Sequence, residues 1–202
     1  AFLESGWESA NTRGRMMIIK ELCSGRLEAD QGVKDSLNTC TTCGLCTENC
    51  PAGISPPDII ERARGMLVAL GLTTSELEDL DRKILNSGNT FGEKTDRLCW
   101  LPDRSLIREK ADYVYFVGCM NSYRYHEAAR RTFSILSQFG ATLLAGEQCC
   151  GSPLLRTGFD ARKVIDENSR QIKRIGARTV ITGCAGCYTT LKNSYGNQFQ
   201  VL

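Results

Sequence analysis

The sequence predicts a small α-helical domain followed by an α/β domain built on a parallel sheet. Up to residue 88, apolar residues recur at helical spacing, whereas from residue 112 onward short β-rich runs alternate with helical segments. Such alternation is typical of a Rossmann-like parallel sheet with right-handed crossovers. A stretch rich in Gly, Asn, Asp and Pro separates the two parts. We therefore predict domains at 1–88 and 112–202, joined by a linker at 89–111.

Three helices are predicted in the first domain. The first covers residues 15–24, where apolar residues follow one another at helical spacing. The second starts after Ser55, a favourable N-cap followed by two prolines that suit a first helical turn, and it ends at Gly71. The third covers residues 75–86, with acidic residues early and a lysine late, as the helix dipole favours.

The second domain alternates strands and helices along its whole length. Short runs rich in β-branched and aromatic residues predict strands, and longer segments with helical spacing predict the helices between them. The expected strands are 113–117, 142–144, 179–182 and 199–202, and the expected helices are 123–139, 161–175 and 188–195.

The overall composition excludes several classes of protein. Of the 202 residues 42% are hydrophobic, which suffices for a core, and the net charge of +2 does not suggest nucleic acid as a partner. The longest apolar runs, such as 66–70, are far shorter than the roughly 20 residues of a membrane span. Eleven cysteines, an odd number in close clusters, favour metal sites in a reducing compartment. We expect a cytoplasmic protein, or one held at the cytoplasmic face of a membrane through a partner.

Four of these cysteines lie within the segment CTTCGLCTENCP at residues 40–51. The spacing CxxCxxCxxxCP is that of cysteines which wrap a cubane [4Fe-4S] cluster, as in ferredoxins. A zinc site is the alternative, but zinc ligands are usually split into two distant pairs. We therefore predict a ferredoxin-type cluster site formed by Cys40, Cys43, Cys46 and Cys50.

The fourth cysteine of such a run commonly binds the second cluster of a two-cluster unit, and no second triplet precedes it here. Either a further motif lies before Ala1 and exchanges a cysteine with this one, or Cys50 or Cys23 completes a lone cluster. We favour the first alternative, because the chain starts with alanine and not methionine. The first domain is then incomplete at its N-terminus, and Cys23 is expected to be a buried helix thiol.

Five more cysteines follow predicted strands of the second domain. Cys119 follows the first strand, Cys149 and Cys150 follow the second, and Cys184 and Cys187 follow the third. Because the loops after parallel strands lie at one edge of the sheet, these cysteines are expected to converge. Five thiolates are one more than tetrahedral zinc or a cubane takes, which indicates an unusual cluster. The alternatives are a disulfide within the adjacent pair or a CxxC redox pair.

Three further residues are weaker candidates. Arg156, in the predicted loop after the double cysteine, could stabilise an anionic cluster or a substrate carboxylate, or could simply be solvated. His126 is expected to be a surface or capping group, and Cys99 to pack under the linker. The glycines within 183–186 lack the spacing of a phosphate-binding loop, so nucleotide binding is not expected.

Several segments together resemble one family. FVGC at 116–119, CCGSPLLRTG at 149–158 and GCAGC at 183–187 resemble the CCG cysteine-rich domain of heterodisulfide reductase catalytic subunits and related iron–sulfur oxidoreductases. CTTCGLCTENCPAGI and DRLCWLP are also similar to those subunits. The resemblance implies that the five late cysteines hold a noncubane [4Fe-4S] cluster. Such subunits carry two ferredoxin motifs and two CCG repeats, so we expect this chain to be the central portion, with the first repeat at 112–202.

The resemblance implies an oxidoreductase subunit of anaerobic metabolism, in which electrons from the cubane cluster reach a noncubane cluster that reduces a heterodisulfide or a related disulfide. The implied partners are that substrate and other redox subunits, such as a flavoprotein, a ferredoxin-like protein or a membrane cytochrome. A second hypothesis is an electron carrier between a flavoprotein that oxidises glycolate or lactate and a quinone or membrane cytochrome. A third is an interaction module stabilised by zinc.

Overall fold

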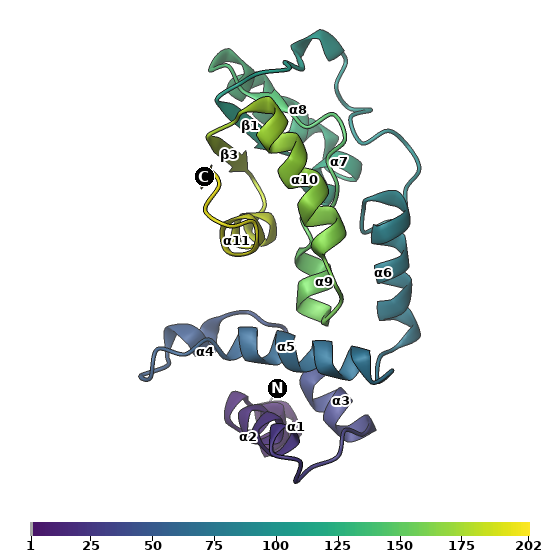
Figure 1. Ribbon diagram of the computed structural model, residues 1–202, viewed down its shortest axis with the longest axis vertical. Helices are drawn as coiled ribbons and strands as arrows, with labels where there is room; N and C mark the ends of the chain where they lie inside the picture. Colours follow the sequence, from purple (N-terminus) through teal and green to yellow (C-terminus); the bar gives the residue numbers. More distant parts are fainter. Residues whose placement is uncertain (1) are drawn as a thin grey trace. The chain divides into compact units, whose positions relative to one another are not determined.

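The computed structural model describes residues 2–202, which divide into two compact units (Figure 1). The first unit extends to Glu78 and also includes Leu154–Asp160. The second unit comprises Asp79–Pro153 and Ala161–Leu202. A short segment from late in the sequence therefore belongs to the helical first unit.

The first unit consists of helices. Its core is formed by apolar side chains of three of them, and these side chains are Ile19, Val33, Leu37, Ile60, Ala63 and Leu67. The elements in chain order are α1 (Phe2–Ser5), the 3-10 helix η1 (Glu8–Ala10), α2 (Thr12–Cys23), α3 (Gln31–Asn38), α4 (Leu45–Glu48), α5 (Pro56–Ala69) and α6 (Ser75–Ser87), of which the last continues into the second unit.

The three helices predicted for this part are present as α2, α5 and α6. Helix α2 starts earlier than predicted, because the side chain of Asn11 accepts a hydrogen bond from the backbone of Gly14 at 2.8 Å and caps the helix there. Ser55 occupies the N-cap of α5, but its side chain makes no capping hydrogen bond. The two prolines that follow it have no N–H to donate.

Two expectations for the first unit require correction. Helix α3 was not predicted; the side chain of Asp30 caps it by accepting a hydrogen bond from Val33 N at 2.8 Å. Cys23 is exposed and not buried. It is the last residue of α2, one turn beyond the buried Ile19, where the helix gives way to Ser24.

The second unit is an α/β layer. Its four strands are all parallel and are arranged in the order β2-β1-β3-β4. The predicted fold, a Rossmann-like parallel sheet preceded by a small helical domain, is confirmed. The elements from here to the end of the chain are η2 (Arg104–Leu106), β1 (Tyr113–Phe116), α7 (Gly118–Tyr123), α8 (His126–Gln138), β2 (Thr142–Leu143), α9 (Ser152–Thr157), α10 (Arg162–Ile175), β3 (Thr179–Thr182), α11 (Ala185–Ser194) and β4 (Gln200–Val201). Of these, α9 belongs to the first unit from Leu154 onward.

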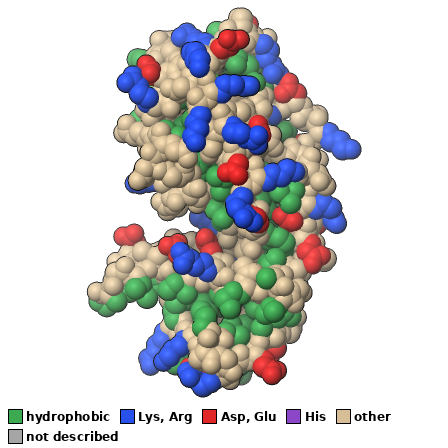
Figure 2. All heavy atoms as spheres, viewed as in Figure 1, with side chains coloured by type: hydrophobic (Ala, Val, Ile, Leu, Met, Phe, Trp, Pro, Cys, Tyr) green, Lys and Arg blue, Asp and Glu red, His purple; other side chains and the backbone are tan. Residues whose placement is uncertain are grey.

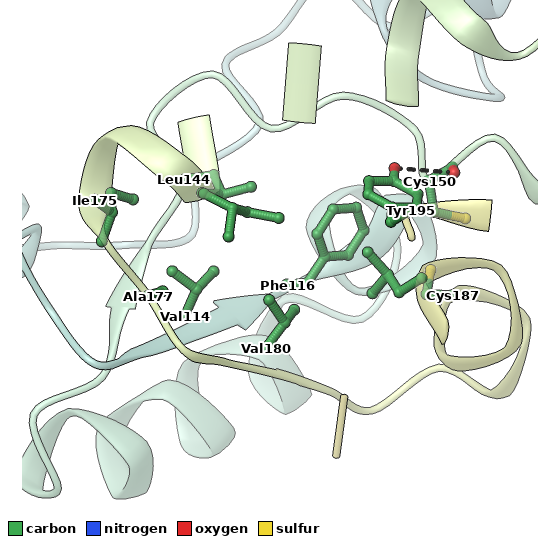
Figure 3. Packing of buried hydrophobic residues seen from close by; sticks show 11 residues of the cluster. Val114, Phe116, Leu144, Cys150, Ile175, Ala177, Val180, Cys187 and Tyr195 are labelled. Carbon is green, nitrogen blue, oxygen red and sulfur yellow. Dashed lines mark hydrogen bonds between the residues drawn. The ribbon is translucent and has the colours of Figure 1, made fainter. Parts of the chain in front are cut away.

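Both faces of the sheet are buried. Val114 and Phe116 of β1 pack on one face with residues of α10 and α11, such as Ile175 and Cys187 (Figure 3). Tyr115 and Phe133 belong to the core on the other face, which also includes Leu98, Trp100 and Leu101. The segment predicted as a linker thus contributes apolar side chains to this core.

Short helices near the strand ends differ from the prediction. The helix expected at 123–139 is present as α8, and an additional short helix, α7, precedes it. Helix α7 starts at Gly118, whose φ of +76° allows a sharp turn directly after β1. Helix α11 starts at Ala185, earlier than expected. The segment with Arg156 is not a loop but the helix α9.

The surface of the molecule is mixed. In the view of Figure 2, basic and acidic side chains are interspersed over the second unit, and hydrophobic side chains gather over the helices of the first unit. Exposed apolar residues of the first unit include Met17, Met66 and Leu70. Within residues 2–202, we find no helix whose length and apolar character would suit passage through a bilayer.

Candidate functional site

The five cysteines of the second unit lie at the carboxyl end of its parallel sheet. Cys119 lies in the first turn of α7 after β1, Cys149 and Cys150 lie between β2 and α9, and Cys184 and Cys187 lie at the start of α11 after β3. All but Cys184 are buried. Figure 3 shows Cys150 and Cys187 at the end of the core toward which β1 points. The parallel topology brings together cysteines that are far apart in the sequence.

The five sulfur atoms form a continuous series of neighbours, which we call the sulfur row. Each sulfur makes a hydrogen-bonding contact with the next, in the order Cys119, Cys149, Cys150, Cys187 and Cys184. No disulfide joins any pair of cysteines in the described part of the chain. The row combines the adjacent pair and the CxxC pair in one site.

The pKa values of cysteines in the sulfur row are shifted by their neighbours in a way that favours binding of positive ions. Hydrogen bonds from Cys149 and Cys187 hold the pKa of Cys150 well below its ordinary value. The contact of Cys187 with Cys150 raises the pKa of Cys187, and burial adds to this effect. For Cys149, the hydrogen bond with Cys119 lowers the pKa, but the contact with Cys150 and burial outweigh it and raise the pKa to about 12. Because neighbouring thiolates repel one another in a buried site, all five can ionise together only beside positive ions.

At the start of α11, a backbone N–H group donates a hydrogen bond to one of the sulfur atoms. Cys184 is the N-cap residue, and its Sγ accepts a hydrogen bond from Cys187 N at 3.4 Å. The positive end of the helix dipole also favours thiolate at this place. A Cβ atom added to Gly118 would lie 3.1 Å from the Sγ of Cys187, so glycine is needed where the chain passes the row after β1.

A buried network fixes the backbone of the double cysteine. Asn168 of α10 donates from Nδ2 to the carbonyl oxygen of Cys149 at 3.2 Å, and its Oδ1 accepts from Gln148 N at 2.8 Å. The hydroxyl of Tyr195 donates to the carbonyl oxygen of Cys150 at 3.0 Å, the hydrogen bond drawn in Figure 3. Asn168 and Tyr195 are also hydrogen-bonded to each other.

A buried ion pair, Arg97 with Glu147, was missed by the sequence analysis. One carboxylate oxygen of Glu147 is 3.0 Å from Arg97 Nη2, and Arg97 Nη2 is 3.4 Å from the Sγ of Cys119. The sequence offered one signal for this pair: Arg97 is followed by the apolar Leu98, Trp100 and Leu101. A charged side chain beside residues that become buried needs a partner of opposite charge. Its partner lies 50 positions away, and no local pattern identifies it.

The four cysteines of the first unit lie in the connection from α3 to α5, around the short helix α4. Positive φ values of +50° at Thr42 and +84° at Gly44 turn the backbone tightly here. Thr42 N donates to the Sγ of Cys40 at 3.4 Å. The backbone N–H of Leu45 lowers the pKa of the exposed Cys43, and Thr41 contributes in the same direction. The turn thus favours thiolate, as a cluster ligand requires.

Arg64 of α5 supports this connection from inside the first unit. Its buried guanidinium donates to the carbonyl oxygens of Leu37 at 2.6 Å, Cys40 at 2.5 Å and Arg156 at 2.5 Å. Burial lowers the pKa of Arg64. The positive charge of Arg156 acts on Glu61, whose pKa is nevertheless raised by burial. The structure therefore gives Arg156 contacts within the first unit, and its role beside a cluster stays a prediction.

The remaining cysteine, Cys99, does not pack under the preceding segment as expected. It is exposed, and its Sγ lies 3.9 Å from Nε2 of His126, the first residue of α8. The neighbouring Trp100 takes the buried position instead, because the large indole fills the core against Phe133. Cys99 and His126 therefore form an exposed pair.

The arrangement of the ligands suits a cluster better than a single ion. Within residues 2–202, no three His, Cys, Asp or Glu side chains are placed to hold one metal ion. Tetrahedral zinc needs four donors around one point. A four-iron cluster is larger, and each of its cysteines binds a different iron, so its ligands need not surround one point. The sulfur row supplies five cysteine sulfurs, four of them buried, which suits such a group.

Helices with a CxxCxxCxxxCP run and a parallel sheet with five cysteines at its carboxyl end define an iron–sulfur protein. Comparisons with known proteins extend this result. The family model described as a 4Fe-4S dicluster domain matches residues 2–54, and the one described as a cysteine-rich domain, CCG, matches residues 113–192. No solved structure was found to match the chain.

Curated relatives agree with the family models. The chain is 36% identical, over 92% of its length, to one subunit of the dihydromethanophenazine:CoB–CoM heterodisulfide reductase of Methanosarcina barkeri. It is 34% identical, over 81%, to one subunit of the fumarate reductase (CoM/CoB) of Methanothermobacter marburgensis, and 27% identical, over 80%, to EtfAB:quinone oxidoreductase of Syntrophomonas wolfei. The chain belongs to the family of CCG-domain iron–sulfur proteins that includes this heterodisulfide reductase subunit.

The chain spans only part of these relatives. It covers 47% of the heterodisulfide reductase subunit, 34% of the fumarate reductase subunit and 26% of the quinone oxidoreductase. The matches support a cubane and a noncubane [4Fe-4S] cluster as cofactors. They support a role in iron–sulfur electron transfer, and both reductase relatives are named as subunits.

Proposed function

We propose that the chain belongs to a disulfide reductase whose substrate is a heterodisulfide of two thiol cofactors or a related disulfide. In this proposal the sulfur row holds the noncubane cluster at which the disulfide is reduced. The ferredoxin-type cluster is held by the cysteines of the first unit, which are Cys40, Cys43, Cys46 and Cys50. The observation that carries the proposal is the buried sulfur row at the carboxyl end of the sheet, where open α/β sheets bind their ligands.

The reaction consumes two electrons and two protons and converts one disulfide into two thiols. When bound, the two clusters supply single electrons to the sulfur–sulfur bond of the substrate. Four of the five cysteines of the row are buried and thereby exclude water from the site. Cys184 is the partly exposed member, so the substrate is expected to approach from its side.

The proposed partners are other redox subunits that deliver the electrons. Two of the relatives are themselves named as subunits of reductases. A flavoprotein, a ferredoxin-like protein or a membrane cytochrome could serve as the donor for this chain. We place the assembly in the cytoplasm or at the cytoplasmic face of a membrane, because cysteines kept reduced for metal binding suit a reducing compartment.

The substrate test adds a thiol to the oxidised, cluster-loaded protein under anaerobic conditions and follows the EPR spectrum. Because one half of the substrate leaves as a thiolate that can bind iron, we expect a thiol to change the signal of the noncubane cluster. The Cys99→Ser variant, which alters an exposed cysteine outside both sets, should respond as the wild type does. A noncubane signal that stays unchanged at saturating thiol would contradict disulfide reduction at this site.

A second function is favoured by one of the relatives. The match to EtfAB:quinone oxidoreductase favours an electron carrier between a flavoprotein, of the glycolate- or lactate-oxidising kind or another, and a quinone or membrane cytochrome. A carrier needs both clusters but no substrate at the sulfur row. Copurification with a flavoprotein, together with an EPR signal that does not change when a thiol is added, would support this function. A colourless protein that contains only zinc would support the interaction module and contradict both redox functions.

A further inference from the structure

We infer that Arg97 is a positioning residue that holds a positive charge against Cys119 and thereby raises the reduction potential of the cluster bound by the sulfur row. The inference rests on the proposed role of Cys119 as a cluster ligand. It concerns a side chain that belongs to neither cysteine set, although it lies within DRLCWLP, one of the segments that carry the resemblance.

The guanidinium of Arg97 is fixed on several sides. The side chain is only 8% exposed. It donates from Nη2 to the Sγ of Cys119 at 3.4 Å, from Nη1 to the carbonyl oxygen of Gly88 at 3.2 Å and from Nε to Glu147 at 3.0 Å. The ring of Tyr123 lies with its centroid 5.6 Å from the guanidinium carbon. A flexible surface arginine would not keep one N–H on a sulfur in this way.

Glu147 connects the ion pair to the backbone that directly precedes Cys119. Its two carboxylate oxygens accept hydrogen bonds from Val117 N at 2.7 Å and Gly118 N at 2.9 Å. These two residues directly precede Cys119, and Glu147 itself lies two positions before Cys149. The carboxylate therefore faces backbone N–H groups and Arg97, whereas the guanidinium faces the sulfur.

The charges of Arg97 and Glu147 lie in a buried environment, where electrostatic interactions are stronger than at the surface. A cavity of about 610 Å³ is lined by Arg97, Glu147 and Tyr123, and Cys119 is not among its lining residues. Arg97 and Glu147 border this cavity, but their side chains are only 8% and 1% exposed. Buried charges interact more strongly than exposed ones, and hydrogen bonds to the sulfurs of a cluster tune its potential.

The direction of the effect follows from charge. Reduction adds an electron, so a nearby positive charge stabilises the reduced cluster and a nearby negative charge destabilises it. Removal of the charge of Arg97 should lower the reduction potential, and removal of the charge of Glu147 should raise it. A pair that served only to hold the fold together would not give shifts of opposite sign.

The test compares Arg97→Met and Glu147→Gln with the wild type in an EPR-monitored redox titration of the cluster-loaded chain. Arg97→Met keeps much of the side-chain length without charge or donor, and Glu147→Gln keeps one acceptor oxygen. We expect shifts in opposite directions, each corresponding to about a tenfold change in the reduction equilibrium, which is about 59 mV for a one-electron couple. The matched control is Arg104→Met, an exposed arginine of the same segment that pairs with Asp96, and its potential should equal that of the wild type.

Arg97→Lys tests the same charge without the planar guanidinium and remains informative if Arg97→Met does not fold. We expect Arg97→Lys to stay closer to the wild-type potential than a neutral side chain would. If Arg97→Met and Glu147→Gln bind iron as the wild type does and leave the potential unchanged, the inference is overturned while the proposed function stands. If the wild type itself shows no signal of a second cluster, the assignment of Cys119 fails and the proposed function fails with it.

Discussion

Single residues decide how closely the five sulfurs of the second unit approach one another. Gly118 lets the chain turn at positive φ directly after β1, and no side chain separates it from Cys187. The side chain of Cys184 accepts a hydrogen bond from the backbone of Cys187 and thereby caps α11. The site depends on backbone conformation at these positions as much as on the cysteines themselves.

Replacement of Gly118 by alanine should damage this site more than it damages the fold elsewhere. The new Cβ would lie 3.1 Å from the Sγ of Cys187 and would require a φ of +76°. We expect backbone strain to lower the free energy of unfolding by about 1–3 kcal/mol. We also expect the second unit to lose most of its iron. Iron content and thermal unfolding would measure both effects.

Gly25→Ala is the control for Gly118→Ala. Gly25 has a similar φ of +69°, but no atom lies within 4 Å of the position of its Cβ. This variant should show only the cost of strain and keep its iron. Equal iron content in the two variants would contradict the idea that space beside Cys187 is needed for the cluster.

Sequence reasoning at this scale found the cysteines but not the residues that support them. Nine cysteines could be assigned to two sets because their spacing and their positions after strands are local features. Arg97 and Glu147 form a pair only through folding, across 50 positions. The exposure of Cys23 and Cys99 could not be predicted either, because burial depends on which elements pack over a residue.

Among the elements, α10 and α11 hold the double cysteine in place. Asn168 of α10 binds the backbone on both sides of the bond between Gln148 and Cys149, and Tyr195, at the end of α11, binds the carbonyl of Cys150. Because the hydrogen bonds of Asn168 and Tyr195 to the carbonyls of Cys149 and Cys150 are buried, the loss of either leaves an unpaired polar atom in the interior.

Asn168→Ala should therefore destabilise the second unit by about 3 kcal/mol, since several buried polar groups lose their partner at once. Tyr195→Phe removes a single hydroxyl and should cost about 1 kcal/mol. Arg170→Ala, an exposed position of α10, should change little. Denaturant unfolding of the three variants would test this order, and an Asn168→Ala variant as stable as Arg170→Ala would contradict it.

The longer elements could be predicted because their periodicity extends over several turns. The helices α5, α6 and α10 and the strand β3 agree with the prediction at most of their boundaries. The short helices α3, α7 and α9 were missed, because caps and turns at single residues decide them and not a repeated apolar pattern. The convergence of the five cysteines was predictable, since it follows from parallel topology alone.

At the scale of the molecule, each unit carries its own cysteine set. The helical unit contains Cys40 to Cys50, and the α/β unit contains the whole sulfur row. The family models divide the sequence in the same sense, with one match in 2–54 and the other in 113–192. Electron transfer within the chain requires that both sets be filled with clusters.

The central claim is that nine cysteines hold two clusters, and a count of iron and acid-labile sulfide on the anaerobically reconstituted chain tests it most directly. We predict about eight of each in the wild type, and about four of each when Cys149 and Cys150 are both replaced by serine. The Cys23→Ser and Cys99→Ser variants should keep about eight. An unchanged count in the Cys149 and Cys150 double variant would contradict the account, because the sulfur row would then hold no cluster.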